Sequence, residues 1–495
     1  VPITGAQQPV VFWSPDSRWI AFISDHKLWK IATGGSAPVL IAPLSQIARG
    51  FHSGAWGADD RIVLAALFGG LYEVSARGGR PVEALAADAG LVDFHNLSFL
   101  PDGRTLLAVP HKLENMASVE VIRGKNRQTI ATFDAMVRDV VYSPTGHLLV
   151  SRRDINAGLW AMPFSTETMT PTGKEFLVAA GAGACTASSD GSLSYVVNID
   201  YGPKQIVRVD GKGKIIAKIG DAIDTADHPI LSPDEKTLAI SARQEDNSSG
   251  IELVDSITGT RRQMTHGFVR ETPASWSHDG RQLVAHREPT FNWSDPRFGV
   301  WLVPAYNTGE PRRLAAGWEG SFTPDDRNVV FLTLGLREIS NIVSVPVRGG
   351  APVVMMKSPF QRGSLALSPD GHLVAYRARE SESLAIYVTR YPSGEGKWQV
   401  SPGEAGMPTW SGDGRTLYYA SGNRLMSASV GQSSEVVVGP PVMLFDATPF
   451  NVNLDHGFQV LRDGSMIAIQ DLPPDKRQVV LVQNWLAEFS EDEKH

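Results

Sequence analysis

Short apolar runs separated by turn residues recur from one end of the chain to the other. In the stretch 97–109, an apolar run leads into Pro101, Asp102 and Gly103, and a second apolar run follows. Proline fixes φ, aspartate hydrogen-bonds its own backbone and glycine tolerates positive φ, so this tripeptide predicts a tight turn between two strands. Helix-period patterns are nearly absent outside the tail at 485–490. The pattern therefore predicts strands joined by hairpins along the whole chain.

The same turn phrase occurs eleven times, at intervals of 43 to 50 residues. Its fullest form reads Trp-Ser-Pro-Asp, and the last position falls at Asp16, Asp59, Asp102, Thr145, Asp190, Asp234, Asp279, Asp325, Asp370, Asp413 and Asp463. A period of this size with strand-like content is typical of a β-propeller, in which each repeat is a four-stranded blade. Third strands are predicted at 27–31, 70–74, 158–162 and 299–303, and a fourth strand at 351–355.

The fold class is therefore predicted as all-β, a β-propeller of about eleven four-stranded repeats of about 44 residues. We expect two lobes of five and six repeats, with residues 1–225 in the first and 226–495 in the second, and one large ring as the alternative. The last repeat supplies three strands, at 457–461, 466–470 and 479–483. Residues 1–5 resemble its fourth strand and exit turn, which would close a ring and remove open sheet edges.

Composition narrows the choice of function. The 495 residues carry 46 basic and 53 acidic side chains, a net charge of −7, without a basic run. Because phosphate backbones bind clustered Lys and Arg, nucleic acid is not an expected partner. The longest apolar stretch, 62–72, is too short to cross a bilayer, and no signal peptide is visible, so either a leader was removed or the chain is a fragment. Cys185 is the single cysteine and is predicted to be a core residue rather than a nucleophile.

The repeats resemble those of a known family. The phrase at 13–16 followed by a β-branched strand resembles TolB-like, PD40 (WD40-like) repeats. Residues 12–22, 27–31 and 479–488 resemble more closely the propeller region that follows bacterial serine/threonine kinase domains. This resemblance implies an extracytoplasmic, periplasmic or secreted bacterial protein with a sensor or interaction role, attached in its parent protein to an upstream kinase or membrane anchor. The kinase loops themselves and a Gly-x-Ser-x-Gly elbow do not occur in the sequence.

Histidines recur at one place in the repeat. Seven residues before the turn position lie His52, His95 and His456, and His228 lies at a neighbouring position of its own repeat. Neutral imidazoles bind transition metals well, so these side chains are candidate ligands for a divalent metal such as Mn or Zn, with Ca considered as well. Oligogalacturonate lyases are similar propellers with a histidine-rich metal site. The alternative is that each histidine caps a strand start and hydrogen-bonds a neighbouring blade.

Two glutamates in consecutive repeats suggest a different chemistry. Glu271 and Glu319 lie at strand starts, where one carboxylic acid would protonate a leaving group and the other would act as base or nucleophile in glycoside hydrolysis. The alternative is that both are charged residues on a solvated rim. These carboxylates, or the histidines in a metal-assisted polysaccharide lyase, make a carbohydrate-active enzyme the second functional hypothesis.

Other candidate ligand-binding residues lie at the same predicted rim and in the least repeat-like segment. The rim residues are Arg138, Arg362 and Glu404, and the segment 286–298 adds Phe291, Trp293 and Arg297. Aromatic side chains beside arginine suit carbohydrate stacking or a protein partner. The leading hypothesis is a non-catalytic propeller that binds a protein, peptide or glycan at its channel mouth and requires no cofactor.

Overall fold

The chain divides into two compact units, one formed by Val1–Ile199 with Lys476–His495 and the other by Asp200–Asp475. They are called unit 1 and unit 2 below. The computed structural model describes residues 10–45, 47, 50–88, 90–112, 116–153, 157–197, 203–244, 248–268, 270–289, 295–306, 308–333, 341–357, 362–380, 383–432, 435–473 and 478–489. The residues 1–5 that the sequence assigns to a closing strand lie outside these ranges.

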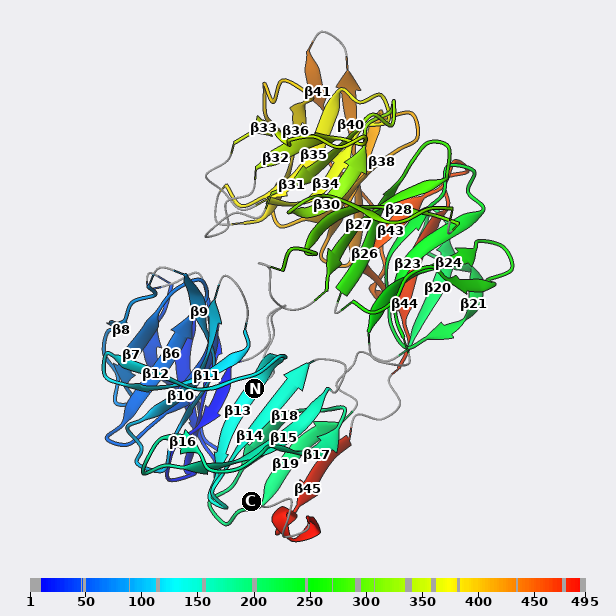
Figure 1. Cartoon of the computed structure of the whole chain (residues 1–495). Helices are drawn as coiled ribbons and strands as arrows, with labels where there is room; N and C mark the ends of the chain where they lie inside the picture. The colour runs from blue at the N-terminus through cyan, green and yellow to red at the C-terminus, as the bar shows by residue number, and fades with distance from the viewer. Residues whose placement is uncertain are drawn as a thin grey trace. The chain divides into compact units, whose positions relative to one another are not determined.

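Five antiparallel sheets lie in the described part of unit 1 (Figure 1). Sheet by sheet, their strands are β1 (Val11–Trp13), β2 (Trp19–Ser24), β3 (Lys27–Ala32) and β4 (Val39–Pro43); β5 (Phe51–Trp56), β6 (Arg61–Ala66), β7 (Leu71–Ser75) and β8 (Val82–Leu85); β9 (Leu91–Phe99), β10 (Leu106–Lys112), β11 (Ser118–Arg123) and β12 (Asn126–Thr132); β13 (Met136–Ser143), β14 (His147–Arg153), β15 (Gly158–Ser165), β16 (Thr170–Pro171) and β17 (Phe176–Ala180); and β18 (Ala182–Ala187), β19 (Leu193–Val197) and β45 (Gln478–Val482). The first strands β1, β5, β9, β13 and β18 pack in series.

Six antiparallel sheets lie in the described part of unit 2. Their strands are β43 (Val452–Val460), β44 (Met466–Asp471), β20 (Lys204–Val209) and β21 (Ile215–Ile223); β22 (Ala226–Leu231), β23 (Thr237–Arg243), β24 (Ser249–Asp255) and β25 (Arg261–Gln263); β26 (Arg270–Trp276), β27 (Gln282–Glu288), β28 (Gly299–Pro304) and β29 (Arg312–Ala315); β30 (Trp318–Phe322), β31 (Asn328–Leu332), β32 (Ile342–Pro346) and β33 (Val353–Met356); β34 (Arg362–Leu367), β35 (Leu373–Ala378), β36 (Ala385–Arg390) and β37 (Trp398–Gln399); and β38 (Gly406–Trp410), β39 (Thr416–Ser421), β40 (Arg424–Gln432), β41 (Val436–Val438) and β42 (Val442–Asp446).

The first strands of unit 2 form a closed series. Each of β43, β22, β26, β30, β34 and β38 packs against the next, and β38 packs against β43. This is the arrangement of propeller blades around a central axis, so the predicted all-β propeller class is confirmed. Short 3-10 helices complete the described secondary structure, η2 (Thr448–Phe450) and η3 (Trp485–Glu488).

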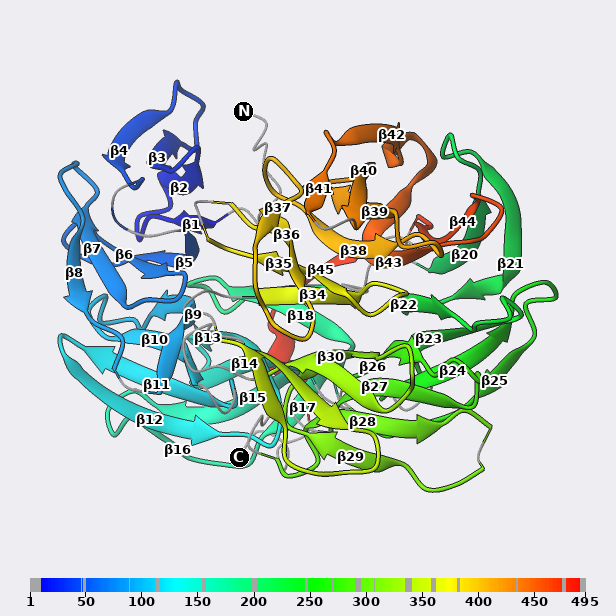
Figure 2. The ribbon, with the colours of Figure 1, turned by 90° about the horizontal axis from the view of Figure 1, so that it is seen from above.

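The boundary between the units differs from the predicted one at residue 225. Strands β20 and β21 precede that position, yet they pair through β44 with β43 in a sheet of unit 2, as Figure 2 shows where green β20 lies beside red β44. Strand β45 instead pairs with β19 in unit 1. The three strands assigned from sequence to one last blade are therefore divided between the units, because each unit completes a sheet with a strand from a distant part of the chain.

The recurring turn phrase has a consistent hydrogen-bond pattern. In one copy the Ser277 hydroxyl donates to Asp279 over 2.7 Å, while Asp279 accepts the backbone N–H of Arg281 over 2.9 Å. The serine oxygen in turn accepts the N–H of Gln282, so the phrase satisfies turn donors that would otherwise be open. The same Ser- or Thr-to-Asp bond occurs at Ser14–Asp16, Ser188–Asp190, Ser232–Asp234, Thr323–Asp325, Ser368–Asp370 and Ser411–Asp413.

The apolar core lies between neighbouring sheets. In one layer, Val284 and Val300 of the β26 sheet pack with Val329, Phe331 and Val343 of the β30 sheet. Unit 1 has an additional layer at its last sheet, where buried Trp485 of η3 joins Leu149, Leu159 and Leu193. The tail that the sequence predicted to be helical is therefore a single 3-10 turn that covers a sheet with one large aromatic side chain.

Replacing Trp485 with alanine should destabilise unit 1 by about 3–5 kcal/mol, since it removes a fully buried aromatic and leaves a cavity. Trp13→Ala is the matched control because the Trp13 side chain is 57% exposed, and its effect should stay within about 0.5 kcal/mol. Urea unfolding followed by circular dichroism measures both. Equal losses for the two variants would show that η3 does not contribute as its burial indicates.

Candidate functional site

The starts of the first strands share an unusual backbone conformation. Six residues before the turn position, φ is positive at Asn96, His228, Glu319, Ser364, Met407 and Gly457, with values from 48° to 89°. At each of these places the register between first and second strand shifts, as in a β-bulge. Non-glycine residues seldom adopt this region, and bulges redirect side chains near binding sites. The bulges therefore set the orientation of the candidate residues predicted at these strand starts.

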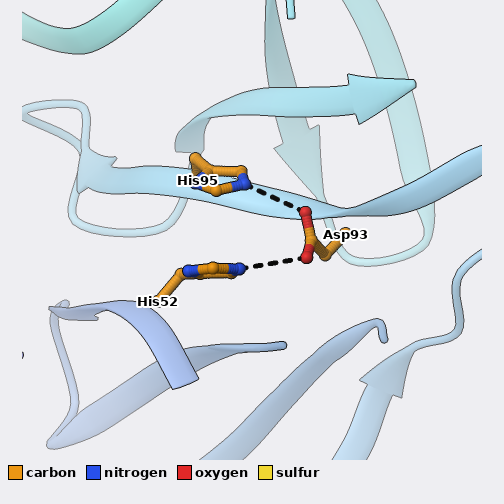
Figure 3. Close-up of side chains that lie close together, drawn as sticks. All are labelled: His52, Asp93 and His95. Carbon is orange, nitrogen blue, oxygen red and sulfur yellow. Dashed lines mark hydrogen bonds and ion pairs between the residues drawn. The ribbon is translucent and has the colours of Figure 1, made fainter. Parts of the chain in front are cut away.

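In unit 1, three imidazoles contact one carboxylate, and Figure 3 shows two of them, His52 and His95, beside Asp93. Nε2 of His52, on β5, lies 3.1 Å from Oδ2 of Asp93, on β9, and Nε2 of His95 lies 3.0 Å from Oδ1. Nδ1 of His111, on β10, lies 3.2 Å from the same Oδ1. The rings of His52 and His95 are stacked with their centroids 4.2 Å apart. We call these four residues the histidine–aspartate cluster.

Asp93 is ionised in this cluster. Its side chain is buried, which alone would raise the pKa of the carboxyl, but hydrogen bonds from His111, His52 and His95 outweigh burial and hold the pKa far below its usual range. Its Oδ2 also accepts the backbone N–H of Phe68 over 3.0 Å. Burial lowers the pKa of His95, against the opposing effect of Asp93, so its imidazole is neutral at neutral pH. Imidazole nitrogens beside an ionised carboxylate form a ligand set suited to a divalent metal.

The repeat pattern of the sequence identified His52 and His95 but not Asp93 and His111. Asp93 lies two residues before His95, and successive side chains of a strand alternate between its faces. This spacing was the available signal for a shared face. His456 and His228, predicted as further metal ligands, belong to unit 2.

His456 links two blades of unit 2. Its Nδ1 donates to Asp227 at the start of β22, and its Nε2 lies 3.2 Å from Oδ1 of Asp471 on β44. Asp471 also pairs with Lys204 of β20 and accepts from the Asn453 amide. Burial alone would lower the pKa of His456, but its hydrogen bonds to Asp227 and Asp471 raise it to about 9. Both ring nitrogens are thus engaged with aspartate side chains.

The two glutamates proposed as catalytic also accept hydrogen bonds from other groups of the protein. Glu271 is fully buried, accepts from Arg287 Nε over 2.5 Å and accepts from the Thr265 hydroxyl. Burial raises the pKa of its carboxyl, and Arg287 offsets part of that rise. Glu319 accepts the backbone N–H groups of Ser364 and Leu365 over 2.8 and 2.6 Å, so it joins the bulges of two neighbouring blades.

Basic side chains lie near this carboxylate. Arg270, exposed at the start of β26, and Arg377 of β35 both act electrostatically on Glu319, and Arg270 also acts on His228. Among the described residues, buried Nε of Arg377 and buried Nδ1 of His228 have no hydrogen-bond partner. Such atoms cost free energy unless another group meets them. Two nitrogen atoms without a hydrogen-bond partner in the described part of the chain therefore lie near the starts of the first strands of unit 2.

The remaining predicted ligand-binding residues are dispersed. Arg138 is exposed on β13 of unit 1. Glu404 is exposed in unit 2, where its Oε1 lies 3.9 Å from Nη2 of Arg377. Arg297 pairs with Asp295, whereas Phe291 and Trp293 lie outside the described residues. Arg362 begins β34, and its side chain is not among those described. Cys185 is buried in the core of the last sheet of unit 1, as predicted.

His456→Gln should destabilise unit 2 in a pH-dependent way. Because the pKa of His456 rises from 6.5 to about 9 on folding, its stabilisation is fully present below the unfolded value and is lost as pH rises through the folded value. The loss should be about 1–2 kcal/mol near pH 6 and should fall towards zero near pH 10. Thermal unfolding of both proteins across this range measures it, with His372→Gln as the exposed control. A difference that does not change with pH would contradict a charged link.

No family model matches the chain, and no curated protein matches it. Solved structures do: a putative TolB from Agrobacterium tumefaciens at 12% identity and TM-score 0.41, covering 55% of this chain and 99% of that one, and TolB from Acinetobacter baumannii at 15% identity and TM-score 0.37, covering 63% and 84%. A chain of the nidogen/laminin complex is similar at 11% identity and TM-score 0.35, covering 48% and 94%.

No helix within the described ranges is long and apolar enough to cross a membrane. The chain's own sheets carry the assignment of the fold, since the similarities above are remote. The repeating turn phrase, the four-stranded antiparallel sheets and the closed series of first strands show that the chain is an all-β propeller protein.

Proposed function

We propose that the protein is a non-catalytic binding module whose unit 2 captures a peptide segment of a protein partner at the starts of its first strands. The observation that carries this proposal is a group of nitrogen atoms at these strand starts. Arg270 is exposed, and Nε of Arg377 and Nδ1 of His228 have no hydrogen-bond partner among the residues that the structure describes. Arginine nitrogens donate hydrogen bonds, so the group that they meet is an acceptor, best a carboxylate.

The distribution of charge favours an extended ligand with a defined orientation. His228, Arg270 and Arg377 lie on the part of the ring that runs from β22 to β35. Exposed Glu404 and Asp455 lie at β38 and β43, and Glu404 lies 3.9 Å from Arg377, so the acidic side chains adjoin the Arg377 end of this basic group. A peptide with its acidic side chains at Arg270 would match this charge pattern, and opposite charges across an interface fix orientation and speed association.

The paired-carboxylate enzyme is less well supported by the same residues. A glycosidase needs both carboxyl groups within reach of the scissile bond. Glu271 has no exposed surface, and its two oxygens accept from Arg287 and Thr265. Both oxygens of Glu319 accept backbone N–H groups. These carboxylates join blades, a role that fits a rigid binding ring better than a hydrolase.

The proposal also covers the setting. The sequence resemblance to the propeller regions of bacterial kinases supports an extracytoplasmic sensor or interaction role in a larger parent protein. Within that setting, unit 2 would bind the ligand. A glycan is the alternative to a peptide ligand, and the experiment below distinguishes the two.

Binding of a fluorescein-labelled peptide of alternating Glu and Ala should be measurable by fluorescence anisotropy and should weaken as salt increases, because exposed charges are screened. Arg270→Ala should weaken binding about 5- to 20-fold, which corresponds to about 1–2 kcal/mol for one hydrogen bond at an exposed position. Arg327→Ala is the matched control: Arg327 is exposed and lies after the far end of β30, so its effect should stay within about twofold.

The Lys/Ala counterpart of the peptide and a neutral oligosaccharide complete the design. Equal binding of the Lys/Ala peptide, or binding of the oligosaccharide alone, would overturn the acidic-peptide proposal. Binding that responds equally to the Arg270 and Arg327 variants would place the contact elsewhere on the chain.

A further inference from the structure

A second candidate site lies in unit 1, at the histidine–aspartate cluster. His52, Asp93 and His95 each offer one ligand atom, and these atoms all lie within 4.8 Å of one another. Two of the separations, 3.1 Å and 3.0 Å, join imidazole Nε2 atoms to carboxylate oxygens. Ligand atoms about 2.0–2.2 Å from one metal ion are separated by about 3.3 Å in tetrahedral geometry. The two short separations end on different oxygens of Asp93 and the three ligand atoms lie within 4.8 Å of one another, so small side-chain movements would bring them around one ion.

We propose that the histidine–aspartate cluster binds one divalent transition-metal ion through Nε2 of His52, Nε2 of His95 and a carboxylate oxygen of Asp93. Two imidazoles and one carboxylate favour zinc, nickel, cobalt or iron over calcium and magnesium, which prefer oxygen ligands. The metal takes the place of the hydrogens that now join these three side chains, so the carboxylate keeps a positive partner.

His111 supports the site without coordinating the metal in this arrangement. Its Nδ1 lies 3.2 Å from Oδ1 of Asp93, and the backbone N–H of Phe68 donates to Oδ2. Such contacts orient a ligating carboxylate and tune the affinity of the site. Asp93 itself is buried, so its ligand atoms are fixed by the fold rather than by a flexible loop.

Access to the site comes through the imidazoles. The side chains of His52 and His95 are 31% and 20% exposed, whereas that of Asp93 is 1% exposed. A metal ion therefore approaches from the histidine side, where three protein ligands leave further coordination positions for water or an added ligand. The buried carboxylate supplies negative charge at the bottom of the site, which offsets the charge of the ion.

The stacking of the two imidazoles also favours a shared ion. The ring centroids of His52 and His95 lie 4.2 Å apart, and Nε2 of each ring faces an oxygen of Asp93. A single divalent ion would therefore contact both rings and the carboxylate at once.

The test uses the full-length chain after treatment with a chelator and dialysis. Zinc chloride is titrated into the protein in competition with a chromophoric chelator, and His52→Ala and His278→Ala are titrated in parallel. His278 is the matched control because it too pairs with an aspartate, Asp326, but in unit 2. We expect one zinc per chain, binding weakened at least about tenfold in His52→Ala, and unchanged binding in His278→Ala.

Two further measurements keep the result clear if a variant folds poorly. Circular dichroism of each variant verifies the fold, and zinc should protect His52 and His95 of the unmodified protein from carbethoxylation, as mapped by mass spectrometry. Failure of the unmodified protein to bind zinc would overturn the proposal. So would equal affinity in His52→Ala, or protection confined to other histidines.

Discussion

The pairing of β20 with β44 is the constraint on which unit 2 depends. These strands are joined in register, with Lys204 opposite Asp471, although the chain between them builds the other blades of the ring. The Lys204–Asp471 ion pair and the contact of Arg208 with Ser465 lie along this seam. Without the seam the sheet of β43 would have only two strands, and the closed series of first strands would have an open edge.

Charged side chains at the strand starts act mainly between blades. Asp227 joins β22 to His456 of β43, and Glu319 joins β30 to the backbone of β34. The Ser241 hydroxyl donates to the carbonyl of Glu271, which joins β23 to β26. A buried polar group that is fully hydrogen-bonded specifies one arrangement of its neighbours. The starts of the first strands of unit 2 are consequently held in one rigid arrangement. The polar groups there that have no partner in the part of the protein that the structure describes are available to bind a ligand.

The sequence predicted the repeats because each turn phrase is local. A serine, an aspartate and the following backbone amides meet within five residues, so composition and spacing reveal the turn. The partner of β45 is not local: Val480 pairs with Tyr195, and the alternation of β45 is equally compatible with another sheet. His52 and His95 were found by their shared place in the repeat. Asp93 was missed, because its spacing from His95 predicts a shared face but not that His52 and His111, on other strands, contact it.

Unit 2 lies in the sequence between β19 and β45, which are neighbours in one sheet of unit 1. During synthesis the ribosome therefore releases every strand of unit 2 before it releases the strand that completes unit 1. The domain begun first is the one finished last, and β19 keeps an unpaired edge while the inserted ring folds. Nascent unit 1 thus carries an edge prone to wrong pairing for the time needed to translate residues 200–475.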